Sequence, residues 1–326
     1  MRTLITLFLL VALAAGGWWA WAVYTPVTPS GKQSVLLHTG YSTRRIAIEL
    51  KQAGIIRSVF AFRVWHELHP KLSLKAGEYL FDRTASTRQV HDRIARGDIY
   101  FHVVTIPEGY TMFDIAKAME DAGLGSTQDF LKIAKTRTDL ISDLAPEARS
   151  LEGYLFPNTY QFTRTQSRAE MVGAMVRQFR QVAQQIGLNS DVHKTVTMAS
   201  IVEKETAAPD ERPMVAGVYY NRLAHRIALD ADPSVIYARL LAGNYTGSLH
   251  HADLAVDSPY NTYRFPGLPP GPIGNPGQSS LAAAMHPTNT EFFYFVSDGN
   301  GHHRFARNLD EHNRNVAAYR RALGMR

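Results

Sequence analysis

The side chains best suited to acid–base chemistry are two glutamates, Glu203 and Glu205, at the end of an apolar run that begins at Thr195. A carboxylate inside such a run costs free energy unless it is paired or used, and burial raises its pKa toward the range of a general acid. The two acids are two positions apart, which separates them by roughly 200° around an α-helix. They therefore cannot face one cleft as the paired carboxylates of a glycoside hydrolase do.

Glu203 is the better candidate for a catalytic acid on the basis of its neighbours along the helix. The residues three, four and seven positions before it are small: Ser200, Ala199 and Val196. The corresponding neighbours of Glu205 are bulky and favour packing: Val202, Ile201 and Met198. We therefore predict that Glu203 faces a cleft that admits a substrate ring. The alternative is a surface carboxylate of Glu203 paired with Lys204 or Arg212.

Helices and loops around this run should position the acid. We expect a helix that Asn189 or Ser190 caps and that runs to about Glu205, and a second helix from Asp210 with Pro213 in its first turn. Further helices are expected over 165–186, 234–242, 278–285 and 309–323, with a hairpin around 298–301. The Pro/Gly-rich segment 267–277 has neither the helical nor the strand period of apolar residues, and such a stiff loop suits the wall of a cleft. The segment 150–160, rich in aromatic residues, suits either a cleft lining or a well-packed loop.

Other chemistries have weaker support. The histidine pairs at 250–251 and 302–303 point apart on a strand and lack a metal-binding spacing, and no nucleotide fingerprint is present, so we expect neither a metal nor a cofactor. The chain has no cysteine, which removes disulfides and thiol nucleophiles and suits an oxidising compartment. Its 326 residues carry a net charge of +6, which suits an anionic surface or an ordinary solvated basic face.

The N-terminus predicts a membrane anchor. No charged residue occurs between Thr3 and Ser30, and the apolar stretch from Leu4 to Val23 is long enough to cross a bilayer. Aromatic residues gather at its far end, where they suit the headgroup layer: Trp18, Trp19, Trp21 and Tyr24. We expect Arg2 on the cytoplasmic side and the rest outside, which argues against nucleic acid as a partner. A cleaved signal peptide is the competing interpretation.

An internal repeat precedes the acid-bearing half. Gly40-Tyr41 returns as Gly109-Tyr110 (109 − 40 = 69), and Ile46-Ala47 returns as Ile115-Ala116 at the same offset. Each copy predicts a strand, a turn and a helix capped by Ser42 or Thr111. We therefore predict an α+β protein with an anchor at 1–25, a linker at 26–33, a duplicated small α/β region at 34–145 and a catalytic domain at 146–326.

Several motifs together resemble the endolytic murein transglycosylase (YceG-like) family. The matching stretches are Leu151–Tyr160, Ala199–Thr206, Val218–Leu223, Asp232–Tyr237, Tyr260–Tyr263, Gly267–Gly277 and Tyr294–Val296. The resemblance is specific from Leu151 onward and looser from Val35 to Leu140, where the turn and helix pattern is similar to LysM-type glycan-binding modules. It implies a single-pass inner-membrane enzyme with its catalytic domain in the periplasm, acting on peptidoglycan during cell-wall remodelling, with cell-wall synthases as partners and termination of nascent strands as a role.

The resemblance also implies the chemistry. The family cleaves the β-1,4 bond between N-acetylmuramic acid and N-acetylglucosamine inside the strand and leaves a 1,6-anhydro end. One glutamate suffices because the muramyl C6 hydroxyl replaces water, and by motif position that acid maps to Glu203. The residues expected to contact the glycan are Glu152, Tyr154, Tyr220, Asn221, Asp232, Tyr260, Asn261 and Tyr263.

One position departs from the family. Asp230 stands where the family usually has Gln, so it could supply a second carboxylate. Two alternatives to a lyase therefore stay open: a muramidase-type hydrolase that uses Asp230, and an inactive glycan-binding scaffold.

Overall fold

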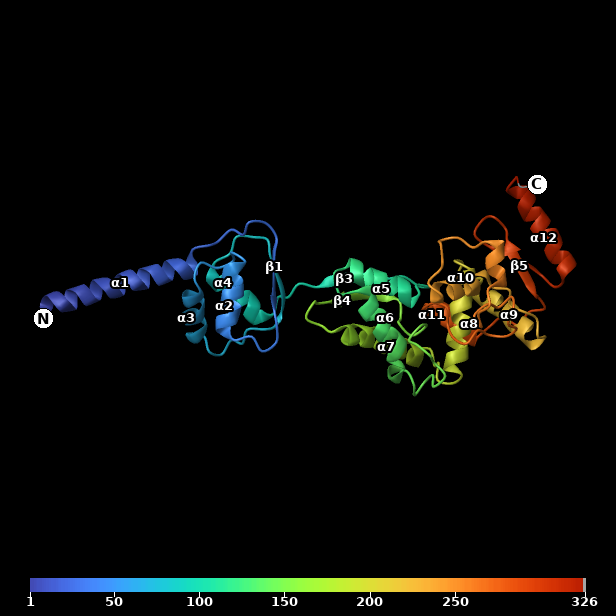
Figure 1. The fold of residues 1–326 in the computed structure, drawn as a ribbon, viewed down its shortest axis with the longest axis horizontal. Helices are drawn as coiled ribbons and strands as arrows, with labels where there is room; N and C mark the ends of the chain where they lie inside the picture. The colour runs from blue at the N-terminus through green and yellow to red at the C-terminus, as the bar shows by residue number, and fades with distance from the viewer. Residues whose placement is uncertain (325–326) are drawn as a thin grey trace. The chain divides into compact units, whose positions relative to one another are not determined.

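The computed structural model describes residues 1–324 as a mixed α/β protein that divides into two compact units. Unit 1 comprises Met1–Val103 and Gln161–Ser167, and unit 2 comprises Val104–Tyr160 and the chain from Arg168 onward. The chain thus passes from one unit to the other and back before it completes unit 2. Each unit has its own helices and strands (Figure 1).

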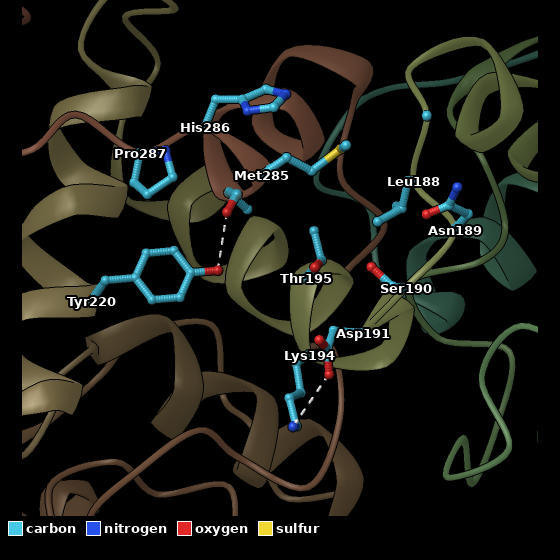
Figure 2. Close-up of a pocket in the computed structure, with 12 residues that line it drawn as sticks. Leu188, Asn189, Ser190, Asp191, Lys194, Thr195, Tyr220, Met285, His286 and Pro287 are labelled. Atoms are coloured by element: carbon cyan, nitrogen blue, oxygen red, sulfur yellow. Dashed lines mark hydrogen bonds and ion pairs between the residues drawn. The ribbon is translucent and has the colours of Figure 1, made fainter.

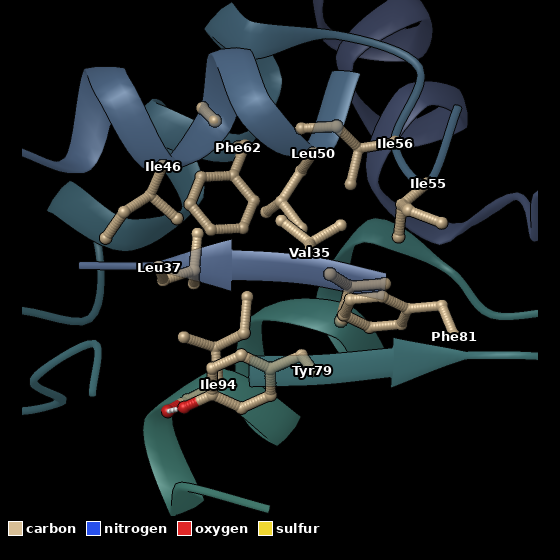
Figure 3. Close-up of a cluster of buried hydrophobic side chains, with 12 residues drawn as sticks. Val35, Leu37, Ile46, Leu50, Ile55, Ile56, Phe62, Tyr79, Phe81 and Ile94 are labelled. Atoms are coloured by element: carbon tan, nitrogen blue, oxygen red, sulfur yellow. Dashed lines mark hydrogen bonds between the residues drawn. The ribbon is translucent and has the colours of Figure 1, made fainter. Parts of the chain in front are cut away.

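Unit 1 begins with a long apolar helix and continues as a small α/β fold. Its elements are α1 (Arg2–Tyr24), β1 (Gln33–Leu37), α2 (Thr43–Gln52), α3 (Val59–Glu67), β2 (Gly77–Phe81) and α4 (Thr87–Arg96). β1 and β2 pair antiparallel, from Gln33 opposite Phe81 to Leu37 opposite Gly77. Side chains from this pair and from α2, α3 and α4 form one buried core, in which Phe62 packs above β1 and Tyr79 lies on β2 (Figure 3).

α1 is long and apolar enough to cross a membrane, and the part that would span it is wholly exposed. Only its C-terminal end is covered by the rest of unit 1, where Ala22 and Val23 are buried with Ala61 and Trp65. The bond from the Thr87 hydroxyl to the Ala22 carbonyl, 2.9 Å long, ties α4 to the same turn. α1 therefore runs without interruption into the folded part of unit 1.

Unit 2 is mainly helical. Its elements, in chain order, are α5 (Met112–Asp121), α6 (Thr127–Thr136), α7 (Arg168–Gln185), α8 (Val192–Glu205), α9 (Arg212–Ala224), α10 (Asp232–Leu241), α11 (Gln278–Met285), β5 (Tyr294–Ser297), β6 (His303–Ala306) and α12 (Leu309–Ala322), with short 3-10 turns at Thr138–Leu140 and His251–Ala255. β5 and β6 form an antiparallel hairpin. The remaining strands, β3 (His102–Ile106) and β4 (Asn158–Phe162), pair with each other where the chain passes between the units.

The elements expected from the sequence are present, with shifted ends. α8 begins after Asp191 rather than after Asn189 or Ser190, and Glu211 rather than Asp210 precedes α9. The expected linker is partly ordered, because Val27 forms a bridge with Ala85. The two strand–helix stretches have element bounds that differ by the expected 69 positions: β1 and α2 match β3 and α5.

The units divide at a different place from the expected domain boundary at 145–146. The second strand–helix stretch lies mainly in unit 2, because α5 packs on α6 and α6 packs on α7. The Met112 N–H at the start of α5 also donates to the buried carboxylate of Glu152, at 3.0 Å. These contacts join residues 104–145 to the second half of the chain.

Candidate active site

α8 is the central helix of unit 2, and it packs against α11, α9 and α10. Its residues from Thr195 to Val202 are all buried. The small side chain of Ser200 lets the 267–277 loop approach, and its hydroxyl accepts the Ile273 N–H at 3.0 Å. α8 therefore holds its last residue, Glu205, on a rigid support.

Glu205 lies in a cavity of about 380 Å³ at the C-terminal end of α8. The side chains that line this cavity come from α8, α9, α10, α12, the β5 region and two loops: Glu205, Tyr219, Arg222, Leu229, Asp230, Asp232, Tyr263, Phe293, Tyr294, Phe295, Leu309 and His312. Acidic and hydroxyl groups lie beside aromatic rings, which is the composition of a site that binds sugar rings. We call this space the Glu205 cavity.

Burial raises the pKa of the Glu205 carboxyl to about 7, and the nearby charge of Asp232 adds to that rise. Hydrogen bonding with Tyr219 and the charge of Arg222 act in the opposite direction. A carboxyl with a pKa near neutrality holds a proton for part of the time and can release it, which is the property of a general acid–base.

Asp232 and Tyr263 form a bonded pair in the same cavity. The Tyr263 hydroxyl donates to the Asp232 carboxylate at 2.7 Å, and burial, together with this carboxylate, raises the pKa of Tyr263. Tyr263 therefore keeps its proton, and the pair presents a fixed donor–acceptor surface. Both residues were expected to contact substrate, and the structure brings them together with Glu205.

Asp230 also lines the Glu205 cavity, in a left-handed backbone conformation with φ of 51°. Its carboxylate accepts a bond of 3.3 Å from Arg222, which also donates to two backbone carbonyls in the same turn. Desolvation raises the pKa of Asp230, against the opposing effect of Arg222. Asp230, the position where the family usually has Gln, thus lines the same cavity as Glu205.

Glu203 occupies a different environment from the one expected. Its side chain is only 5% exposed and forms a 2.8 Å ion pair with Arg212. Its second oxygen accepts the Gly277 N–H, at the start of α11, at 2.9 Å. Glu203 does not line the Glu205 cavity. It joins α8 to α9 and α11. The alternative expectation named Arg212 as a partner but placed the carboxylate at the surface, whereas here it is buried.

Glu152 is fully enclosed as well. Its carboxylate accepts the Met112 N–H and the Asn275 side-chain amide, the latter at 2.8 Å. Burial raises the pKa of Glu152 to about 7, against hydrogen bonds from Met112 and Tyr237. Residues 271–277 around it are buried, so this part of the loop predicted as a cleft wall is a packed support.

Four other expected contact residues serve the packing of unit 2. The Tyr154 hydroxyl pairs with His193 at 2.8 Å, and the Tyr260 ring packs on Tyr237. The amides of Asn221 and Asn261 donate only to backbone carbonyls, at 2.6–3.0 Å. None of the four lines the Glu205 cavity.

Tyr220 lines a second cavity of about 470 Å³ near the N-terminal end of α8 (Figure 2). Its hydroxyl donates to the Ala284 carbonyl at 3.0 Å, while Lys194 pairs with Asp191 at 3.3 Å. This cavity holds no glutamate, and its one acid, Asp191, is paired and exposed. It therefore lacks a candidate for proton transfer.

No group of three or more potential metal ligands occurs within residues 1–324. The residues that sequence reasoning missed are Glu205, Tyr219, Arg222 and His312. The position of Glu205 at the end of its helix was the available signal, because its carboxyl can extend past the last turn into a cavity formed by other elements.

The comparisons with known proteins agree over most of the chain. Residues 35–318 match the YceG-like family. A Bacillus subtilis protein named endolytic murein transglycosylase is 33% identical over 317 residues, covering 90% of this chain and 87% of that protein. A Streptococcus pneumoniae protein of the same name is 29% identical, with 96% of this chain matching 64% of its length.

Among solved structures, a YceG-like protein of Listeria monocytogenes has a TM-score of 0.57 and 32% identity, over 87% of this chain and 98% of that one. Sequence and fold thus point to the same group of proteins, and the chain belongs to the YceG-like family.

Proposed function

We propose that this protein cleaves the glycan strands of peptidoglycan as an endolytic lytic transglycosylase, with Glu205 as its acid–base. The names of its relatives support the substrate class. The observation that carries the proposal is the Glu205 carboxyl, with its pKa near 7, in a cavity lined by aromatic and hydroxyl side chains.

The reaction needs one group that first gives and then takes a proton. Protonated Glu205 donates its proton to the glycosidic oxygen as the bond from that oxygen to muramyl C1 breaks. The muramyl C6 oxygen then bonds to C1, and Glu205 takes the C6 hydroxyl proton, which restores the enzyme and leaves a 1,6-anhydro end. The paired Tyr263 and Asp232 would hold sugar hydroxyl or amide groups in register with this proton transfer.

Glu205 replaces Glu203 in this proposal because of what each carboxylate already does. Glu203 gives both oxygens to Arg212 and Gly277, so a substrate oxygen would have to displace a buried ion pair. The carboxyl of Glu205 lines a cavity that a sugar could enter. The small-residue face beneath Glu203 accommodates the backbone of the 267–277 loop, not a substrate.

Hydrolysis is a second candidate reaction, and the location of Asp230 favours it. A hydrolase uses a second carboxylate to activate water or to form a covalent intermediate. Asp230 and Glu205 line one cavity, so a muramidase reaction has both groups available. Hydrolysis leaves a reducing end that is heavier than the anhydro end by one water.

Both reactions are tested by digesting purified glycan strands with the detergent-solubilised full chain and measuring the masses of the product ends. Anhydro ends from the wild type, with no product from Glu205→Gln, are expected for the transglycosylase. Reducing ends that disappear in Asp230→Asn would assign the muramidase. If strands bind and stay intact with the wild type, the protein is a glycan-binding scaffold and neither reaction holds.

We also propose that α1 anchors the protein in the inner membrane with both units in the periplasm, near cell-wall synthases. The exposed apolar surface of α1 supports an anchor. We further propose that the matched β1–α2 and β3–α5 stretches are LysM-like units that arose by duplication. Two observations support this relation. The elements of the two stretches begin and end 69 positions apart, and both stretches have positive-φ glycines at matching positions, 40 and 54 in the first and 109 and 123 in the second.

A further inference from the structure

We infer that unit 1 carries a second membrane contact, a row of side chains on α3 that rests on the lipid headgroups beside α1. This inference rests on the proposed anchoring by α1. The row consists of Phe60, Val64 and Leu68, which recur every four residues and so share one side of the helix.

The position of this row follows from the helix geometry. Ala61 and Trp65 pack against the last turns of α1, and Phe62 points into the core of unit 1. At about 100° per residue, the row of Phe60, Val64 and Leu68 lies on the side of the α1-facing row that is opposite to Phe62. It therefore flanks the α1 contact, and α3 itself lies at the end of unit 1 from which α1 leaves in Figure 1.

The length of α1 decides how close this face comes to the bilayer. Its 23 residues span about 34 Å, but Ala22 and Val23 are already enclosed by unit 1. The freely exposed part, Arg2–Trp18, is about 26 Å long, because Trp19 already packs against unit 1; this is no more than the usual hydrocarbon thickness of about 30 Å. No length of helix is left to raise unit 1 off the membrane, so its α1-proximal face has to meet the headgroups.

The side chains on this face fit an interfacial layer. Phe60 is 61% exposed and Leu68 is 62% exposed, although both are large and apolar. Cationic groups lie around them: Arg57 stacks on the Trp21 ring at 4.7 Å, Lys71 is exposed, and Arg63 forms an exposed ion pair of 3.7 Å with Glu67. Apolar side chains flanked by cations suit a layer of acyl chains and anionic headgroups.

Site-directed fluorescence on the full chain tests this contact, and the absence of native cysteine makes each label unique. Phe60→Cys and Leu68→Cys are labelled with an environment-sensitive dye in vesicles of phosphatidylethanolamine and phosphatidylglycerol. Leu10→Cys reports insertion of α1. Tyr100→Cys is the control, because Tyr100 is 39% exposed and its N–H bonds to Glu78 of β2. β2 pairs with β1, and β1 lies on the side of unit 1 away from α1 in Figure 1.

Headgroup-attached nitroxide should quench the labels at positions 60 and 68 several times more strongly than the label at position 100. Nitroxide deep in the acyl chains should quench the label at position 10. If position 10 is quenched while positions 60 and 68 match position 100, the anchor holds and the inference is wrong. If position 10 is not quenched, the anchor itself fails and the inference fails with it. Shielding of positions 60 and 68 without lipid quenching would indicate a protein contact and would also overturn it.

Discussion

Replacing Glu203 and Glu205 with glutamine, one at a time, distinguishes the proposed catalytic carboxyl, Glu205, from the structural one, Glu203. Glu205→Gln keeps the shape of the side chain and removes its proton. Turnover should fall on the order of 10²–10⁴-fold, the usual loss for a general acid–base. The free energy of unfolding should rise, because the ionised carboxylate of Glu205 is unfavourable in its cavity and glutamine carries no charge.

The size of that stabilisation follows from the pKa. Burial raises the pKa of Glu205 from 4.5 to about 7, and one unit corresponds to about 1.4 kcal/mol. Since the folded pKa is above the unfolded one, this carboxyl favours folding fully below pH 4.5, and the contribution is lost as pH rises through about 7. Glutamine does not titrate. Above pH 8 the variant should therefore be more stable by up to about 3 kcal/mol, which raises Tm by roughly 6–12 °C for a unit of this size.

Glu203→Gln should lower the free energy of unfolding and leave turnover in place. It leaves the buried Arg212 without its charged partner, and breaking such a pair costs on the order of 3–5 kcal/mol. The folded fraction should retain turnover. Thermal melting and glycan digestion of the two variants in parallel, at pH 4.5 and pH 8.5, measure both effects. The reasoning is refuted if Glu205→Gln digests strands like the wild type, or if Glu203→Gln melts like the wild type and is inactive.

Three further outcomes are expected. The kcat/KM of the wild type should be level below pH 7 and fall as pH rises through about 7, because only protonated Glu205 can start the reaction; a pH–rate profile that climbs to pH 9 would contradict this. Tyr263→Phe removes the 2.7 Å bond to Asp232, which is worth about 1 kcal/mol, so turnover should fall about fivefold and Tm by no more than about 2–4 °C; a lower Tm with full turnover would indicate a packing role. Gly217→Ala places a Cβ 2.2 Å from the Thr288 carbonyl oxygen and should destabilise unit 2 by about 1–3 kcal/mol in a melting experiment, whereas Ala216→Gly on the same helix should cost only about 1 kcal/mol.

The order of helices and strands could be predicted from the sequence because local signals define them. Ser42, Ser86 and Thr111 cap their helices as polar side chains at those positions should. The predicted cap residue was wrong for α8. Asp191 precedes this helix in a left-handed backbone conformation and makes no side-chain cap bond, so no capping side chain marks its start.

The site was harder to predict because the burial of a polar group depends on distant partners. Small neighbours along α8 indicated an open face at Glu203, but the 267–277 loop fills that face. The partners of Glu203 and Glu152 come from residues far along the chain, Gly277 and Asn275. Asp232 and Tyr263 could be predicted from their motifs, whereas His312 joins the cavity only because α12 folds back against the β5–β6 hairpin.

The double passage of the chain between the units has a practical consequence for anyone who divides this protein. Gln161–Ser167 belongs to unit 1 although unit 2 both precedes and follows it. A fragment that ends at Val103 lacks Arg164, which pairs with the buried carboxylate of Glu78 at 3.2 Å. A fragment that starts at Val104 carries the seven residues of a unit that has been removed. A soluble form for crystallisation or inhibitor screening should therefore remove only the exposed part of α1, Met1–Trp18, and keep Ala22 and Val23 on the Trp65 contact surface, so that both units keep every segment they fold with.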